Sequence, residues 1–252
     1  MTRLNRMNQA LANRTFVKVI AGIENFDTHH VMGVVAAAEA AGAHAVDIAA
    51  DAALIRTVKE STSLAVFVSA TEPAKLIAAA EAGADVLELG NFDAMYARGE
   101  EPTAEQILGW TREVKAAVGD NLPLCVTVSG RLPLNVQLDL ATQLQAAGAD
   151  LIQAEGVMGN VEIVDTHSAL TAITSALANA AEIAKAVEMP VFVAGGITPA
   201  NAAFAVGAGA CGVGVGRAVS KLATVAEMEA VAKGVVTSLA NVRAAAPSLA
   251  LA

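Results

Sequence analysis

Aromatic residues are scarce in this chain, which has one tryptophan, one tyrosine and six phenylalanines among 252 residues. Basic residues are also few, because 16 lysines and arginines stand against 25 aspartates and glutamates, for a formal net charge of −9. Proteins that hold nucleic acid by its backbone need basic surfaces, and many stack bases on aromatic side chains. The composition therefore argues against nucleic-acid binding, and a bound phosphate needs local donors rather than net charge.

Cysteine and histidine are equally rare. Cys125 and Cys211 each fall in an apolar run, which favours buried thiols in a reducing compartment over a disulfide or a metal site. The histidines are spread along the chain, so their spacing indicates no metal centre. His167, in a long loop, is the only histidine that suits catalysis, and we expect His29 and His30 to face solvent.

Long uninterrupted apolar runs are also missing, so the sequence predicts no membrane-spanning helix. The first residues, MTRLNRMNQALANRTF, lack the apolar segment of a secretory signal, and we expect a cytoplasmic protein. The high mean hydropathy of +0.52 instead reflects alanine and buried strands, which read as continuous apolar runs in parallel sheets.

The chain repeats one pattern, in which a glycine ends a helix and a strand follows. The four copies are AGAHAVDIA (41–49), AGADVLELG (82–90), AGADLIQAEG (147–156) and AGACGVGVG (208–216). Between them lie strands of a second type, FVKVIAGI (16–23), LAVFVSA (64–70), LPLCVTVSG (122–130) and MPVFVAGG (189–196). We expect helices near 27–41, 51–60, 73–82, 103–117, 133–147, 170–187, 199–208 and 224–244.

Eight strands alternating with helices over about 250 residues predict one (β/α)8 TIM barrel spanning residues 1–252. Its core covers about 15–220, and a C-terminal helix and tail fill 221–252. The longest strand-to-helix loops, 91–101 and 156–168, follow the fourth and sixth strands. In such barrels these loops lie on the catalytic face, at the carboxyl ends of the strands.

Two glycine loops follow the seventh and eighth strands and indicate a phosphate site. Gly195, Gly196 and Ile197 come directly after one apolar run, and Thr198-Pro199 has the pattern of a helix start. Gly214 and Gly216 close the next run, with Arg217 opening a helix. Backbone N–H groups without side chains can surround an oxyanion, and barrels often bind phosphate here. The alternative is that these glycines only close tight turns.

Four charged residues lie in or at the end of apolar strands, namely Lys18, Asp47, Glu88 and Glu155. Charges are rarely buried without partners, and Asp47 on the neighbouring strand is the natural partner of Lys18. One interpretation gives Lys18 a catalytic role, as an amine or a charged clamp, with the carboxylates as acids and bases. The others place Lys18 at the N-terminal rim of the barrel, or make the set a structural salt-bridge layer.

Polar residues of the fourth and fifth strands complete the candidate site. Asn91 either reaches a ligand or caps the next turn, and Thr127 offers a hydroxyl on the same rim. Asn-Phe-Asp occurs at 91–93 and again at 25–27, after the first strand. That duplication favours a shared structural role for the two motifs.

The motifs KVIAGIENFD, VDIAAD, VFVSA, LELGNFD, LCVTVS, IQAEG and GVGVGRA resemble a family named after hypothetical chloroplast open reading frame twenty-three, found in cyanobacteria and some algal plastids. The resemblance covers about residues 14–220. It implies an aldolase-type TIM barrel in the cyanobacterial cytosol or plastid stroma, and it implies no activity. The glycine loops are similar to those of ribulose-phosphate-binding and thiamin-phosphate-synthase-like barrels.

Two hypotheses follow from these residues. The first is a lyase or isomerase that acts on a small phosphorylated metabolite; a variant that binds FMN in the same loops is weaker, because aromatic residues are few. The second is a catalytically silent barrel that binds a phosphorylated ligand or a protein partner. The tail AAAPSLALA leaves apolar residues without a place in the barrel, so we also expect a homodimer.

Overall fold

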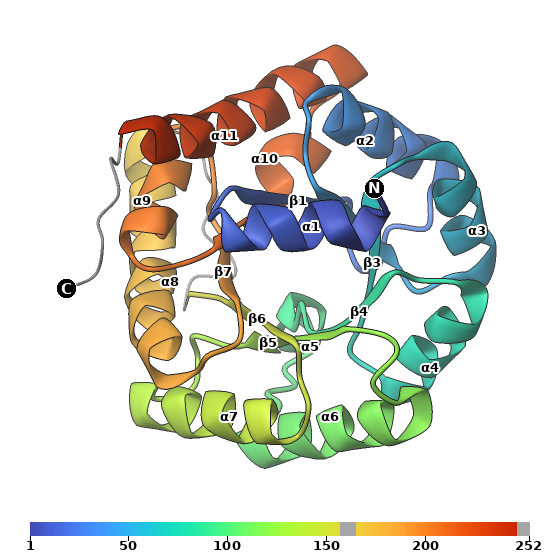
Figure 1. The fold of residues 1–252 in the computed structure, drawn as a ribbon, viewed down its shortest axis with the longest axis vertical. Helices are drawn as coiled ribbons and strands as arrows, with labels where there is room; N and C mark the ends of the chain where they lie inside the picture. Colours follow the sequence, from blue (N-terminus) through green and yellow to red (C-terminus); the bar gives the residue numbers. More distant parts are fainter. Residues whose placement is uncertain (157–164, 246–252) are drawn as a thin grey trace.

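The computed structural model describes residues 1–156 and 165–245. Within them the strands form one closed parallel barrel in chain order, because β1 pairs with both β2 and β8. The predicted (β/α)8 barrel is therefore confirmed, and Figure 1 shows its helices as a ring around the strands. The strands are β1 (Phe16–Ile20), β2 (Ala45–Ala49), β3 (Ala65–Ala70), β4 (Val86–Leu89), β5 (Leu124–Val128), β6 (Leu151–Ala154), β7 (Val191–Ala194) and β8 (Gly212–Val215).

The helices of the outer ring follow their predicted ranges closely. Among the described residues these are α2 (Thr28–Ala40), α3 (Ala52–Ser61), α4 (Pro73–Ala82), α6 (Ala104–Val118), α7 (Leu134–Ala146), α8 (Thr166–Ala186), α9 (Ala202–Gly207) and α11 (Val225–Ala245). The helix α8 begins four residues before the predicted start, because Asp165 and Ser168 form a capping box. The tail 246–252, on which the predicted homodimer rests, lies outside the described residues.

The repeated AGA pattern has the structural role that the sequence predicts. Its glycines Gly42, Gly83, Gly148 and Gly209 all have left-handed φ angles, between 77° and 99°, directly after a helix. The pattern also contains a device that the sequence did not reveal. The side chains of His44, Asp85 and Asp150 each accept a hydrogen bond from a main-chain N–H of the preceding strand. Desolvation lowers the pKa of His44, so this histidine is a neutral structural acceptor.

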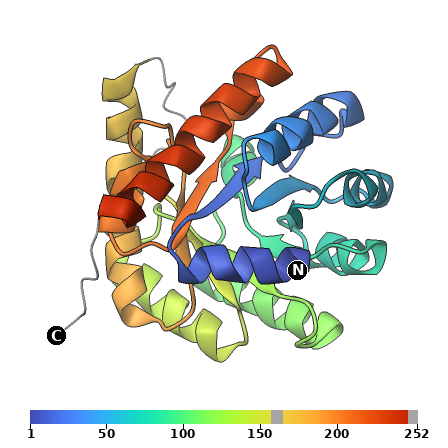
Figure 2. The same cartoon turned by 45° about the horizontal axis from the view of Figure 1, so that its top comes forward.

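The first helix, α1 (Arg3–Ala12), closes the N-terminal end of the barrel, and the sequence analysis missed it. Thr2 caps it, and its apolar residues Met7, Ala10 and Leu11 are buried. Its arginine Arg3 donates hydrogen bonds to the main-chain oxygens of Lys59 and Thr62. Figures 1 and 2 show α1 lying across the end of the barrel, so a ligand must enter from the opposite, C-terminal end.

Two further short helices lie on the C-terminal side, α5 (Asp93–Ala97) and α10 (Arg217–Ser220). Both follow strands directly, in the loops after β4 and β8. The described part of the chain contains no helix long and apolar enough to cross a membrane.

Candidate active site

The interior of the barrel has an apolar lower layer and a polar upper layer. The rings of Phe16, Phe67 and Phe192 fill the lower layer, and α1 packs beneath them. The ring centroid of Phe67 lies 6.1 Å from that of Phe16, and the centroid of Phe192 lies 5.4 Å from it. Above them the strands point charged and polar side chains inward, since side chains alternate along each strand. The polar layer consists of Lys18, Asp47, Ser69, Glu88, Thr127 and Gln153, all at most 1% exposed.

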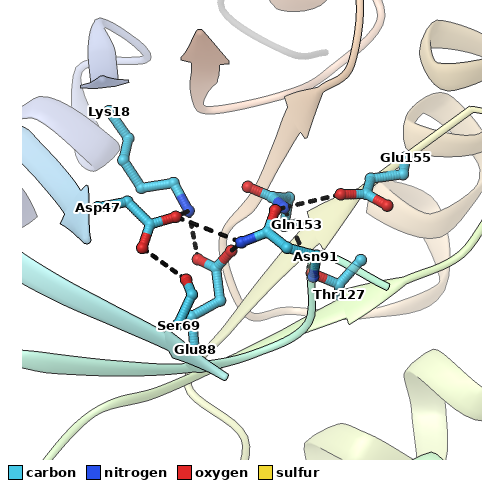
Figure 3. A network of polar contacts seen from close by, with 8 residues as sticks. All are labelled: Lys18, Asp47, Ser69, Glu88, Asn91, Thr127, Gln153 and Glu155. Atoms are coloured by element: carbon cyan, nitrogen blue, oxygen red, sulfur yellow. Dashed lines mark hydrogen bonds and ion pairs between the residues drawn. The ribbon is translucent and has the colours of Figure 1, made fainter. Parts of the chain in front are cut away.

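Lys18 forms one end of this network, with its ammonium close to Asp47 and Glu88, and is fully buried (Figure 3). Its Nζ lies 3.2 Å from Oδ2 of Asp47 and forms a second ion pair with Glu88. The ammonium also lies 5.0 and 5.1 Å from the ring centroids of Phe67 and Phe192. The predicted pairing of Lys18 with Asp47 is present, and Lys18 lies in the lumen rather than at the N-terminal rim.

The charges of this cluster set its protonation. Burial acts to lower the pKa of Lys18, but the attraction of Asp47 and Glu88 is larger in sum and raises it above its ordinary value. Burial raises the pKa of Glu88 to about 7; Lys18 opposes this shift and Asp47 adds to it. Burial, reinforced by Glu88, also raises the pKa of the neighbouring Cys125 thiol. At neutral pH the cluster thus contains a charged lysine, a carboxyl group that can exchange a proton, and a neutral thiol.

Ser69 and Asn91 supply the remaining donors to the two carboxylates. Ser69 Oγ donates to Oδ1 of Asp47 at 2.5 Å. Asn91 Nδ2 lies 3.4 Å from Asp47 Oδ2 and 3.3 Å from Glu88 Oε1, so one amide bridges both groups. Asn91 has a φ of 58°, a left-handed conformation that asparagine tolerates better than most residues. That backbone conformation directs a polar side chain over the ion-pair cluster.

A second group of polar side chains extends from Asn91 toward β6. Gln153 Nε2 lies 3.3 Å from Asn91 Oδ1, 3.3 Å from Thr127 Oγ1 and 3.0 Å from Glu155 Oε1. The network joins Lys18 to Glu155, as the dashed lines of Figure 3 show. Sequence reasoning did not single out Gln153, although it stands two residues before Glu155, a spacing that puts two side chains of an extended chain on the same side. Asn91 and Glu155 are only partly buried and form the accessible edge of the network.

The two Asn-Phe-Asp motifs do not share a role, which corrects the sequence-based expectation. After β1, Asn25 donates to Ala21 O and Asp27 caps α2, while Phe26 is exposed. After β4, Asn91 belongs to the buried network and Phe92 is fully buried. The difference lies in the partners, because only the β4 loop leads its asparagine over two buried carboxylates.

Gly90 makes the position of Asn91 possible. A Cβ atom added at Gly90 would lie 1.9 Å from Thr127 Oγ1 and 2.4 Å from Thr127 Cβ. We therefore expect Gly90→Ala to displace Asn91 and lower the free energy of unfolding by about 1–3 kcal/mol, the usual cost of overpacking. Urea unfolding measures this, with Gly109→Ala as the control, because nothing lies within 4 Å of that added Cβ. Equal stability of the two variants would show that Thr127 does not constrain the loop.

The loop after β7 exposes main-chain donors. Gly195 and Gly196 have φ angles of 91° and 74°, which favour glycine, and Gly195 is exposed. The predicted helix start at Thr198-Pro199 is wrong, since α9 begins at Ala202. The reason is the buried Asn201, whose side chain accepts from Thr198 N at 2.9 Å and donates to Gly196 O at 2.8 Å, so that these residues form a turn.

Strand β8, which leads into the second glycine loop, lies beside Lys18. Gly214 is buried and is the register partner of both Lys18 and Ala194, whereas Gly216 is partly buried and Arg217 is exposed. Within residues 1–156 and 165–245, no group accepts a hydrogen bond from the N–H of Gly195, Gly196 or Gly216. These N–H groups are available to an anion at the C-terminal end of the barrel. Ile197, also a candidate, is buried.

His30 connects the loop after β1 to this region, contrary to the expectation that it faces solvent. Asn25 Nδ2 lies 2.8 Å from His30 Nδ1, and His30 Nε2 lies 2.9 Å from the main-chain oxygen of Ser220 in α10. Since an amide nitrogen donates and a carbonyl oxygen accepts, His30 carries its proton on Nε2. His29 is exposed as predicted, and His167 is exposed at the start of α8. Among the described residues, no three His, Cys, Asp or Glu side chains are placed to hold a metal ion.

Solved structures with the same architecture include enzymes of several kinds. Thiamine phosphate pyrophosphorylase from Pyrococcus furiosus aligns with a TM-score of 0.59 and 19% identity, over 92% of this chain and 98% of that one. For 3-hexulose-6-phosphate synthase from Salmonella typhimurium the TM-score is 0.64 and the identity 15%, over 90% of this chain and 99% of that one. For tryptophan synthase subunit alpha from Legionella pneumophila the TM-score is 0.65 and the identity 15%, over 96% of this chain and 99% of that one. At these identities the similarity establishes the fold alone.

Similarity in sequence is closer to a group of algal proteins. The uncharacterized protein ycf23 of Cyanophora paradoxa is 36% identical over 89% of this chain and 92% of its own length. The ycf23 protein of Antithamnion sp. is 32% identical, over 90% of this chain and 85% of its own length. The family model described as "Protein of unknown function (DUF561)" matches residues 3–245. The chain therefore belongs to this family, which confirms the resemblance seen in its motifs.

Proposed function

We propose that this protein is an enzyme of the lyase or isomerase type that acts on a small phosphorylated metabolite. The observation that carries the proposal is the position of the two glycine loops beside the buried charged cluster. Gly214, at the foot of the second loop, pairs in register with Lys18. A phosphate bound by the loops would therefore place the rest of the metabolite over the network of Asn91, Gln153 and Glu155.

In this proposal the phosphate is held by main-chain N–H groups of Gly195, Gly196, Ile197, Gly216 and Arg217. Glycine allows the closest approach of an oxyanion, and Gly214 keeps the space below the loop free of a side chain. Arg217 is exposed and adds a positive charge at the entrance. This arrangement supplies local donors to an anion in a protein of net charge −9.

The proposed chemistry is proton transfer. Glu88 has a pKa of about 7, so near neutral pH it can both donate and accept a proton, as general acid–base catalysis requires. Lys18, held charged by Asp47 and Glu88, acts as an electrostatic clamp rather than as a nucleophile. Asn91 and Glu155 lie at the accessible edge, where they contact the metabolite and connect it to the cluster.

One observation favours the alternative of a catalytically silent binding protein. Lys18 and Glu88 are both 0% exposed, beneath Asn91, so catalysis requires Asn91 to yield when the metabolite binds. In a silent barrel the charged cluster would serve stability alone. Turnover of a phosphorylated metabolite that is lost in Glu88→Gln, while phosphate binding persists, distinguishes the enzyme from the binding protein.

The test of the anion site is calorimetric titration of the protein with inorganic phosphate. We expect saturable binding, and we expect Gly196→Val to weaken it at least about tenfold, or 1.4 kcal/mol, because a β-branched side chain fills the space of the phosphate. The control is Gly83→Val. Gly83 has a φ of 99°, so valine there causes similar backbone strain, but it stands at a helix end where no atom lies within 4 Å of an added Cβ. Equal binding by the two variants, or no binding by the wild type, would overturn the site.

We further propose that the protein works in the cytosol or plastid stroma and as a homodimer. The algal relatives and the absence of a membrane-spanning helix among the described residues are consistent with the first point. Exposed apolar side chains, such as Phe204 on α9 at 53% exposure, support the second.

A further inference from the structure

Gln153 contains the one atom of the polar layer whose hydrogen-bonding capacity is unused among the described residues. The side chain is 0% exposed, and its Oε1 has no donor in the part of the chain that the structure describes. A buried acceptor without a donor loses its hydration and gains nothing in return, which is costly. Such an atom in a candidate site points to a ligand that supplies the donor.

The orientation of the Gln153 amide is fixed by a chain of contacts that begins at the two carboxylates. Asp47 and Glu88 face the Asn91 amide, so its Nδ2 must point to them and its Oδ1 to Gln153. Gln153 then meets Asn91 Oδ1 and Glu155 Oε1, which both accept. Turning the amide over would place Oε1 against these two oxygens. Nε2 therefore occupies this side, and Oε1 must face the other way.

On its free side, Oε1 faces β8 at Gly214. A Cβ atom added at Gly214 would lie 3.3 Å from Oε1, 3.2 Å from Ala194 Cβ and 3.2 Å from Ile20 Cδ1. By alternation along β8, Gly212 shares this inward face with Gly214, so the strand contributes no side chain to the lumen. The unpaired oxygen thus faces the strand that leads into the second proposed phosphate loop, at the position that pairs with Lys18.

We propose that Gln153 Oε1 accepts a hydrogen bond from a hydroxyl group of the ligand, on a carbon near its phosphate. The inference rests on the proposed function and narrows it, because it selects polyhydroxylated phosphate monoesters over phosphate esters that lack hydroxyl groups. A ligand that lacks the hydroxyl group would leave this buried acceptor unpaired, so the site should bind such a ligand much more weakly. Gln153 is in this proposal a specificity-determining residue, and Gly214 places no side chain against its oxygen.

The experiment compares two ligands that have the same three carbons, glycerol 3-phosphate and n-propyl phosphate, by calorimetric titration. We expect the wild type to bind glycerol 3-phosphate at least about tenfold more tightly. Gln153→Met should abolish this preference and leave the affinity for n-propyl phosphate within about twofold. Equal affinities of the wild type for the two ligands would overturn the inference, with Oε1 then served by a buried water. Binding of neither ligand would instead refute the phosphate site itself.

A second variant separates ligand recognition from the support that Gln153 gives to its neighbours. Gly214→Ala leaves the donors of Gln153 in place, and the position has no left-handed φ that would strain an alanine. Its methyl group crowds Oε1, so we expect the same loss of preference for glycerol 3-phosphate. Gly109→Ala on α6 is the control and should keep the preference. Equal weakening of both ligands in Gln153→Met and in Gly214→Ala would show a structural role and contradict the proposal.

Discussion

Replacing Lys18 with methionine is expected to lower the free energy of unfolding by about 3–5 kcal/mol, the usual cost of breaking a buried ion pair by removing one partner. The substitution leaves Asp47 and Glu88 buried at 1% and 0% exposure without their cation. Methionine keeps most of the volume between Phe67 and Phe192, so the loss reports charge rather than a cavity. Urea unfolding at neutral pH measures it.

Two further variants make this result interpretable. Lys75→Met breaks an exposed ion pair, in which the side chain of Lys75 is 56% exposed and that of Glu72 is 62% exposed. It should lower the free energy of unfolding by only about 0–1 kcal/mol. Adding Glu88→Gln to Lys18→Met removes one of the stranded carboxylates and should recover part of the lost stability. If Lys18→Met were no more costly than Lys75→Met, Lys18 would not be the cation that the cluster requires.

The second large effect is a dependence of stability on pH that comes from Glu88. Its pKa rises from an ordinary value of 4.5 to about 7 on folding, so between these values the folded chain binds more protons than the unfolded one. The stability from this group is therefore fully present below pH 4.5 and is lost as the pH rises through about 7. A shift of this size corresponds to roughly 3 kcal/mol.

The measurement is the free energy of unfolding at intervals between pH 4.5 and 8, for the wild type and for Glu88→Gln. The difference between the two curves should change across this window, because glutamine cannot titrate. Gly109→Ala, which changes no titratable group, should run parallel to the wild type. A constant difference between wild type and Glu88→Gln would mean that Glu88 is not a proton-exchanging group, and the proposed chemistry would lose its acid–base residue.

The barrel could be read from the sequence because its local signals agree with each other. The AGA repeats place a left-handed glycine at four helix ends, and apolar runs follow at regular spacing. The helix α1 was missed because its apolar residues Met7, Ala10 and Leu11 form a narrow stripe in a polar segment. Their burial depends on an open barrel end that only the closed sheet creates.

The charged residues of the site could be found because a charge inside an apolar strand is conspicuous. The role of Gln153 could not be found in this way, and neither could the difference between Asn25 and Asn91, since neutral amides occur in many environments. What distinguishes them is which groups the folded chain brings near them. Asn91 meets two carboxylates and Gln153 meets Asn91, and neither contact is encoded by spacing along the chain.

The most direct test of the phosphate site is a titration with inorganic phosphate followed by ¹H–¹⁵N spectra of the assigned protein. The account predicts that the amide signals of Gly195, Gly196 and Gly216 shift in parallel and saturate at one concentration. The amides of the glycines at the opposite end of the barrel, such as Gly42 and Gly83, should stay unchanged. Saturable binding that leaves the three loop glycines unmoved, or no saturable shift anywhere, would contradict it.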